Sequence, residues 1–203
     1  MTSTLPTAPE FGTPIPIVAE PQVLDFLALR RSTSAVSLAG PGPSPEQIQD
    51  LLRLAARVPD HGKLSPWRFI ILGREAKAAF AKKLEDLAAS RNDSRAVAKL
   101  AKLKTPPLGI AVVSRSMAGE IPLWEQQLSA GAVCTTLLYA AQASGFGANW
   151  ITDWYAYDSA AQAILGLTSE EQVAGFIFIG TSVESPLERE RPNLEGLVTE
   201  WSP

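Results

Sequence analysis

The spacing of apolar residues predicts alternating helices and strands along most of the chain. A short helix is expected over 21–32 and a longer one over 44–59, with Ser44 as the N-cap directly before Pro45. Apolar residues in the longer helix recur at every third or fourth position, which places them on one buried face. These residues are Ile48, Leu51, Leu52, Ala55 and Ala56.

Four apolar runs predict buried strands, because each is short, continuous and bounded by turn residues. The charged segment 74–104 predicts two helices, interrupted near Asn92 and Asp93 and ended by a Pro-Pro pair. A short helix is expected over 159–165. The four predicted strands cover residues 67–72, 108–115, 146–152 and 174–181.

A proline-free stretch of 23 residues, 123–145, predicts one long helix. Its small residues would let neighbouring backbones come close, so we expect it to be buried on most sides. That burial would lie either in the domain core or at a dimer interface. The small residues are Ala130, Gly131, Ala132, Ala140, Ala141 and Ala143.

Strands are interspersed with helices, and there are no repeats and no linker that would split the chain. This pattern predicts a single α+β domain over 22–203. The segment 1–21 contains five prolines and no continuous apolar run, so we expect a flexible tail and not a secretory signal. The polar C-terminal segment offers Leu197, Val198 and Trp201 as residues by which it would dock.

Composition narrows the class of protein. The chain is 46% hydrophobic and 19% charged with a net charge of −3, and its Lys and Arg residues are scattered. This balance predicts neither nucleic-acid binding nor a polybasic membrane patch. No segment approaches the roughly 20 apolar residues of a membrane-spanning helix, so a cytoplasmic protein is expected.

The chain lacks the residues that several classes of catalytic or binding site require. The only histidine is His61, which a serine triad would need as its base, and no serine motif accompanies it. The single cysteine, Cys134, excludes a thiolate zinc site and reads as a small buried hydrophobe. The stretch GFGANW lacks the third glycine of a dinucleotide fingerprint and follows a helix, where that fingerprint follows a strand. We therefore predict no metal site, and a chemistry that does not rely on clusters of Cys and His.

Cationic residues next to a helix end are the remaining candidates. Arg30, Arg31 and Ser32 offer two guanidinium groups and a hydroxyl, which match the oxygens of a phosphate. A solvated basic helix end, favoured by the helix dipole, is the alternative. His61 lies in a loop between Asp60 and Lys63, and the loop alone does not separate a structural from a functional histidine.

Four motifs in order make the chain similar to a known family. They are RRS at 30–32, RVPDH at 57–61 with PWRF at 66–69, the segment from Trp124 to Trp150, and GFIFIGT at 175–181. Together they resemble the flavin-dependent nitroreductase family, most closely its small single-domain NAD(P)H nitroreductase branch. The likeness runs from about residue 22 to the C-terminus.

The resemblance implies a nitroreductase-like fold, with a central, mostly antiparallel sheet flanked by helices in an intertwined homodimer. It also implies FMN bound at the subunit interface and electron transfer from NADH or NADPH through the flavin in a ping-pong scheme. The acceptor would be a nitroaromatic, a quinone or a similar electrophile.

Individual positions carry implied roles. By the resemblance, Arg30, Arg31 and Ser32 hold the FMN phosphate, and Arg191 is a further basic residue toward it. Arg57 and His61 would reach the flavin from the partner subunit. Trp150, Ile151 and Thr152 would line the flavin with their backbone, and 140–145 would lie near the nicotinamide.

The chain also departs from the family pattern. Many relatives have Pro-Ser-x-x-Asn before a Gln-Pro-Trp, whereas this loop reads PDHGKLSPW. Ala35 follows where a second arginine is often found, and Ile151 replaces a basic residue of the closest branch. These departures leave two alternatives open: a different flavin reaction on the same fold, or a non-enzymatic FMN-binding module.

Secondary candidates near the flavin also have two interpretations each. Lys63 would stabilise charge on reduced flavin or be a solvated surface charge. Trp67 and Phe69 would be core residues or flavin-stacking rings. The aromatic loop 153–157 would pack internally or stack on a planar acceptor.

Overall fold

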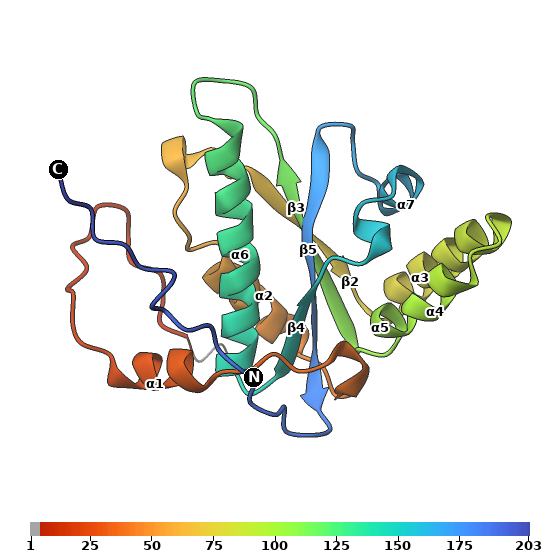
Figure 1. Cartoon of the computed structure of the whole chain (residues 1–203), viewed down its shortest axis with the longest axis horizontal. Coiled ribbons are helices and arrows are strands. Elements are labelled where there is room, and N and C mark those ends of the chain that lie inside the picture. Colours follow the sequence, from red (N-terminus) through yellow and green to blue (C-terminus); the bar gives the residue numbers. More distant parts are fainter. Residues whose placement is uncertain (1–4) are drawn as a thin grey trace.

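A five-stranded antiparallel sheet lies between two layers of helices in the computed structural model, which describes residues 5–203 (Figure 1). The strand order is β1-β5-β3-β2, and β4 also pairs with β5. Every strand pair is antiparallel, which confirms the predicted α+β class. The strands are β1 (Leu38–Ala39), β2 (Trp67–Leu72), β3 (Leu108–Arg115), β4 (Gly147–Ile151) and β5 (Glu171–Ser182).

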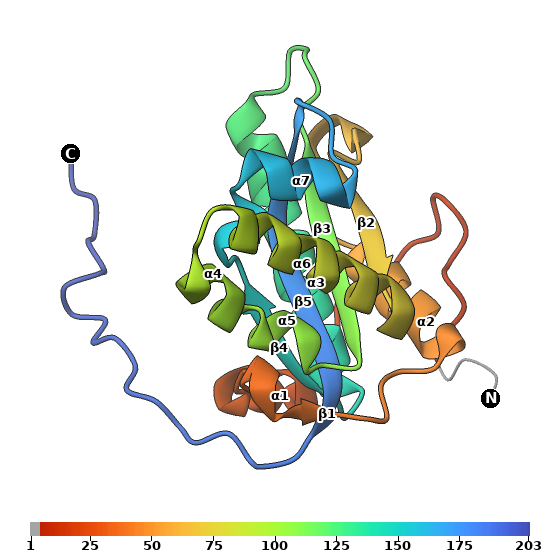
Figure 2. The same cartoon turned by 90° about the vertical axis from the view of Figure 1, so that its right-hand side faces the viewer.

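The two helical layers cover opposite faces of the sheet, and α1 lies at one side of the molecule (Figures 1 and 2). On one face lie α2 (Pro45–Ala55) and α6 (Leu123–Ala143). The helices of the other face are α3 (Arg74–Ser90), α4 (Ser94–Lys99), α5 (Ala101–Lys104) and α7 (Ser159–Leu165). The helix at the side is α1 (Pro21–Leu29).

Alternation along the central strands creates two separate cores. In β5, Phe176 and Phe178 pack toward the α3 side, while Ile177 and Ile179 pack toward α2 and α6. Side chains of successive strand residues point to opposite faces, so a continuous apolar run fills both layers. The uninterrupted apolar runs in the sequence are explained by this burial on both faces.

Local signals placed most elements correctly. Ser44 caps α2 as predicted, and a reciprocal capping box forms with Gln47. The segment 74–104 is corrected, because it forms three helices: α3 ends near the expected break, and Leu100 separates α4 from α5. The long helix ends at Ala143, two residues early, because Gly145 adopts a φ of +85°.

Both terminal segments lie on the surface. Residues 6–20 are exposed and form no helix or strand, and Arg53 donates a hydrogen bond to the Pro6 carbonyl at 2.8 Å. Docking by Leu197, Val198 and Trp201 is wrong within one protomer, because all three side chains are exposed. Figure 2 shows the C-terminal segment extending away from the body of the protein. Between residues 5 and 203, no helix has the length and apolar character needed to cross a membrane.

An ion pair at the edge of the sheet makes stability depend on pH. Arg68 donates to both carboxylate oxygens of Glu171, from Nε at 2.6 Å and from Nη2 at 2.8 Å, and Glu171 is only 8% exposed. These hydrogen bonds, joined by one from the Thr168 amide, lower the pKa of Glu171 to about 2. The stabilisation is complete above the ordinary carboxyl pKa of about 4.3 and is lost as the pH falls toward 2.

We therefore expect the free energy of unfolding to decrease between roughly pH 5 and pH 2, in part through this one carboxylate. Urea unfolding of the parent protein and of Glu171→Gln at pH 6 and pH 3 measures its share. The variant should lose less stability on acidification than the parent, and Glu75→Gln, an exposed change in α3, is the control. Equal losses in the parent and in Glu171→Gln would contradict the assignment.

Candidate functional site

A cluster of arginines lies where the chain leaves α1. Arg30 Nε donates to Gln142 Oε1 at 2.8 Å, its Nη2 donates to Ser32 Oγ at 3.0 Å, and its guanidinium lies 5.1 Å from the centre of the Tyr139 ring. The Gln142 amide group also donates to the Arg31 carbonyl at 2.5 Å. The last turns of α6 therefore hold the segment 30–32 in one conformation.

The C-terminal segment returns to the same place. Arg31 Nε donates to the Leu187 carbonyl at 2.8 Å and lies 3.9 Å from Glu188 Oε1. Arg191 pairs with the same carboxylate oxygen at 2.9 Å. The Arg189 amide and the Arg191 and Arg31 guanidiniums hold the pKa of Glu188 below its usual range. The fold thus brings Arg30, Arg31, Ser32 and Arg191 together, with a carboxylate between two of the arginines.

A surface pocket of about 300 Å³ adjoins this cluster, with Arg30, Arg31, Thr33 and Gly147 among its lining residues. The backbone passes very close here, since a Cβ at Gly147 would lie 2.6 Å from the Leu38 side chain. The Thr33 amide donates to the Ala148 carbonyl at 3.0 Å, which ties β4 to the arginine segment. This pocket has the charge and size to take a phosphate group.

Trp150, Ile151 and Thr152 continue from this pocket along β4. The Trp150 ring fills the space above Gly175, and its Nε1 donates to the Ala174 carbonyl at 3.3 Å. Ile151 packs on the core of the α3 side, and Thr152 is exposed. Two of these three side chains are therefore engaged by the protein itself.

His61 and Arg57 lie elsewhere in the protomer. His61 Nδ1 is 2.8 Å from Glu125 Oε2, in the first turn of α6, whereas Arg30 contacts Gln142 in its last turn. Those two α6 positions are seventeen residues apart, which corresponds to roughly 25 Å along the helix axis. One protomer therefore does not bring the histidine and the arginine cluster to the same ligand.

Glu125 contacts His61, and no pattern in the sequence predicted this contact. Its carboxylate accepts from the His61 ring when Nδ1 carries the proton, and this leaves Nε2 free to face a ligand. The loop itself is held by Asp60, which accepts hydrogen bonds from the amides of Leu64 at 3.1 Å and Ser65 at 2.8 Å. An acidic residue in the first turn of the long helix was the only available signal.

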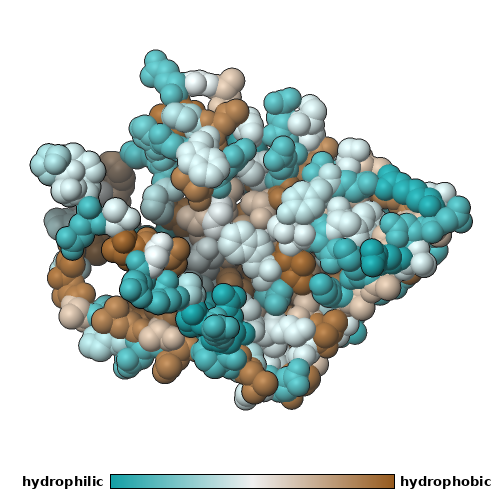
Figure 3. Space-filling view, viewed as in Figure 1, coloured by the Kyte–Doolittle hydropathy of each residue, from teal (hydrophilic) through white to brown (hydrophobic). Residues whose placement is uncertain are grey.

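An unusual amount of apolar surface surrounds these groups. None of the α1 residues is buried, and Val23, Leu24 and Leu29 are all more than half exposed. Leu128 and Trp124 are similarly exposed on α6. Figure 3 shows hydrophobic residues gathered at the lower left, over α1. Exposed apolar areas of this kind mark contact surfaces.

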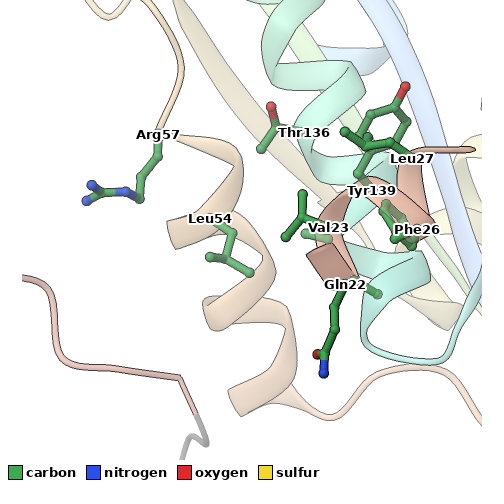
Figure 4. Close-up of a pocket in the computed structure, with 10 residues that line it drawn as sticks. Gln22, Val23, Phe26, Leu27, Leu54, Arg57, Thr136 and Tyr139 are labelled. Carbon is green, nitrogen blue, oxygen red and sulfur yellow. The ribbon is translucent and has the colours of Figure 1, made fainter. Parts of the chain in front are cut away.

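A groove of about 610 Å³ runs between α1, α2 and α6. Figure 4 shows Val23 and Phe26 from α1, Leu54 from α2, and Thr136 and Tyr139 from α6 around it. Arg57 also lines the groove, just beyond the end of α2.

The structure shows the surroundings of Lys63, Trp67, Phe69 and Cys134, whose roles the sequence left open or secondary. The Lys63 ammonium lies 5.2 Å from the centre of the Phe11 ring. Trp67 packs on the core and donates to Ser129 Oγ at 3.1 Å, and Phe69 packs on the same cluster. Cys134 is fully buried and burial raises its pKa to about 12, which confirms it as an inert core residue.

The aromatic loop is divided between core and surface. Tyr155 is completely buried between Phe80 and Phe176, so acceptor stacking is wrong for this ring. Tyr157 is exposed. Over residues 5–203, no three His, Cys, Asp or Glu side chains are arranged to hold a metal ion.

Comparison with known proteins places this geometry in context. Residues 27–181 match the model of the nitroreductase family. The "Putative NAD(P)H nitroreductase YdjA" of Escherichia coli K12 is 34% identical over 161 residues, which is 78% of this chain and 87% of that protein. A "Putative NAD(P)H nitroreductase" of Haemophilus influenzae is 35% identical over 169 residues, 79% of this chain and 89% of its own length.

Solved structures share the fold at lower identity. A nitroreductase-like family protein from Bacillus cereus superimposes with a TM-score of 0.77 at 17% identity, over 91% of this chain and 98% of that one. A "putative nitroreductase in complex with fmn" from Desulfovibrio desulfuricans gives a TM-score of 0.71 at 20% identity, over 91% of this chain and all of that one.

Proposed function

The chain belongs to the nitroreductase family, and from that premise we propose an FMN-dependent oxidoreductase that carries electrons from NADH or NADPH to a small electrophile. The electrophile would be a nitroaromatic, a quinone or a related acceptor, and the protein would act in the cytoplasm. The two half-reactions alternate at one site in a ping-pong scheme, with the donor leaving before the acceptor enters.

The arginine cluster is the observation that carries this proposal. Arg31 and Arg191 converge on one carboxylate oxygen of Glu188, which occupies the kind of position that a phosphate oxygen takes between guanidinium groups. Arg30 and Ser32 lie beside them. Gly147 lines the adjoining pocket, at a position where the Leu38 and Thr33 side chains leave no room for a Cβ. These residues suit the phosphate of FMN, with Glu188 displaced when it binds.

The flavin ring supplies the two-electron chemistry when FMN is bound, and the protein supplies binding, orientation and electrostatics. The backbone of Trp150, Ile151 and Thr152 would run beside the ring system from the phosphate pocket onward. No side chain of this set need act as an obligatory acid or base. The departure at Ile151 removes a positive charge from the ring's surroundings, which affects the choice of acceptor more than the cofactor.

A homodimer would complete the site. His61 lies too far from Arg30 and Arg31 of its own protomer for one FMN to span them, so we assign it, together with Arg57 of the same helix–loop segment, to the flavin of the partner subunit. The exposed apolar faces of α1 and α6 and the groove beside them supply the contact surface. The C-terminal segment, with its exposed Leu197 and Trp201, would add to the contact by lying along the partner.

Glu125 would act as a positioning residue in the complete site. Its hydrogen bond to Nδ1 selects one orientation and one tautomer of His61. The free Nε2 would then face the partner's flavin pocket. The imidazole would thereby bind or orient the cofactor and shape the entrance for the acceptor.

Purified protein saturated with FMN tests the proposal. We expect a yellow protein whose flavin absorbance near the visible maximum is bleached by NADH or NADPH without oxygen and restored by a nitroaromatic or a quinone. Free FMN at the same concentration, which nicotinamides reduce slowly, is the control. A colourless protein that rejects FMN would exclude the cofactor, and bound flavin that neither nicotinamide reduces would favour the non-enzymatic alternative.

A further inference from the structure

A second polar cavity, of about 340 Å³, lies on the α3 side of the sheet and shares no lining residue with the pocket at Arg30 and Arg31. Its walls come from the start of α3, the end of α5 with the prolines that follow it, the segment around β1, and Val183. Three cations line it, namely Arg74, Lys77 and Lys104. Of the described residues that form its walls, none is acidic.

Lys77 is a buried ammonium with an incomplete set of partners. It is 5% exposed, and its Nζ donates one hydrogen bond, to the Lys104 carbonyl at 2.6 Å. An ammonium group has three donors, and a buried charge is costly unless it is paired. No carboxylate of residues 5–203 lies within ion-pair distance of Lys77. Capping of α5 accounts for one donor and leaves the charge uncompensated.

Arg74 adds a second unpaired charge at the same wall. Within the described part of the chain its guanidinium has no hydrogen bond or ion pair, and its charge lowers the pKa of Lys77 in addition to the larger effect of burial. Both cations belong to the first turn of α3, the positive end of a 17-residue helix that no side chain caps. Glu75 is the acidic residue of this turn, but it is exposed, does not line the cavity and, among the described residues, has no ion pair with either cation. The two cations at the cavity wall therefore remain available to an anion.

Two carboxylates contact residues of the cavity wall from outside the cavity. Glu85 pairs with Lys104, and Glu184 accepts a hydrogen bond from the Ser37 hydroxyl at 2.6 Å. Neither of them lines the cavity, and neither pairs with Arg74 or Lys77. The inner wall therefore stays cationic.

We propose that this cavity binds a phosphate group, either as inorganic phosphate or carried by a small metabolite, at a site separate from that of the flavin. The forked guanidinium of Arg74 would take two phosphate oxygens from the open side, and the Lys77 ammonium would meet a third from within. The cavity volume exceeds that of one phosphate, which leaves room for a small organic group. This site does not rest on the proposed function.

Calorimetric titration of the FMN-saturated protein at constant ionic strength tests the site. Saturating FMN is expected to occupy the phosphate pocket at Arg30 and Arg31, and the variants below assign the remaining heat to the second cavity independently of that expectation. We expect saturable binding of one equivalent per chain, with a dissociation constant on the order of 1 mM or below. Inorganic phosphate and glycerol 3-phosphate are the two probes. The probe that binds more tightly tells whether the natural ligand is inorganic phosphate or a phosphate group carried by a small metabolite.

Two variants and one control decide the location. Arg74→Ala, a change at an exposed residue, and Lys77→Met, which keeps the buried volume, should each weaken binding at least about tenfold. Lys83→Ala removes a charge from the exposed side of the same helix and should bind like the parent. FMN content must be equal in all four proteins.

The proposal is overturned if neither probe binds saturably to the FMN-saturated parent, or if Arg74→Ala binds as tightly as the parent. Should Lys77→Met fail to fold, Arg74→Ala alone decides. Loss of FMN affinity without loss of phosphate binding would count against the flavin site and leave this one standing.

Discussion

The Gly131→Arg variant is expected to be a monomer that binds FMN at least about 100-fold more weakly than the parent protein. Gly131 lies on the outer side of α6, and a Cβ built there meets no atom of its own protomer within 4 Å. In the proposed dimer this position faces the partner, where an unpaired guanidinium would cost about 3 kcal/mol or more. FMN binding would weaken when dimerisation is lost, because Arg57 and His61 of the partner complete the site.

The protomer itself should tolerate the change. Replacing a glycine inside a helix improves helix propensity by up to about 1 kcal/mol, and the space outside is open. Loss of the dimer can thus be separated from loss of the fold, which far-ultraviolet circular dichroism and the unfolding midpoint would both monitor.

Light scattering at micromolar concentration measures the oligomeric state, and fluorescence titration measures FMN affinity. The matched control is Ala89→Arg, which places the same side chain at an exposed position of α3 on the opposite face of the sheet. A Gly131→Arg protein that remains dimeric with parental FMN affinity would remove α6 from the interface.

Replacing Arg31 with Ala is expected to weaken FMN binding by about 1.5–3 kcal/mol, as the loss of a charge-assisted hydrogen bond predicts. Arg30→Ala should lose at least as much, since Arg30 also holds Gln142 and lies over Tyr139. In Glu188→Gln the competing negative charge disappears, so its FMN affinity should rise. These opposite directions distinguish a phosphate site from a general loss of structure.

Arg189→Ala is the matched control, because Arg189 lies in the same segment and its guanidinium bonds only to the neighbouring Glu190 carbonyl within the described residues. FMN quenching titrations at one fixed salt concentration compare all four variants, since screening reduces such contacts. Parental affinity in both Arg30→Ala and Arg31→Ala would discard the phosphate assignment.

Local patterns predicted most elements of the fold correctly. The α2 helix follows from a cap, an N-terminal proline and one apolar face, all of which act within a few residues. Leu100 shows the limit of such patterns: helical propensity continues through it and its backbone stays in the right-handed helical region, yet α4 ends before it and α5 begins after it. Leu100 and Leu103 are both fully buried, which depends on how these short helices pack on the sheet.

The sequence by itself determined the family and the kind of residues that a phosphate-bearing cofactor needs, because motifs and apolar periods are local properties of the chain. Only the tertiary structure decided that Arg191 reaches Arg31 through Glu188, that His61 bonds to Glu125, and that α6 separates these two groups. Each contact joins residues more than sixty positions apart, except for the neighbouring pair in the C-terminal segment. Such pairings depend on how helices pack on the sheet, and the same packing encloses Lys77 beside Arg74 in a cavity with no acidic wall.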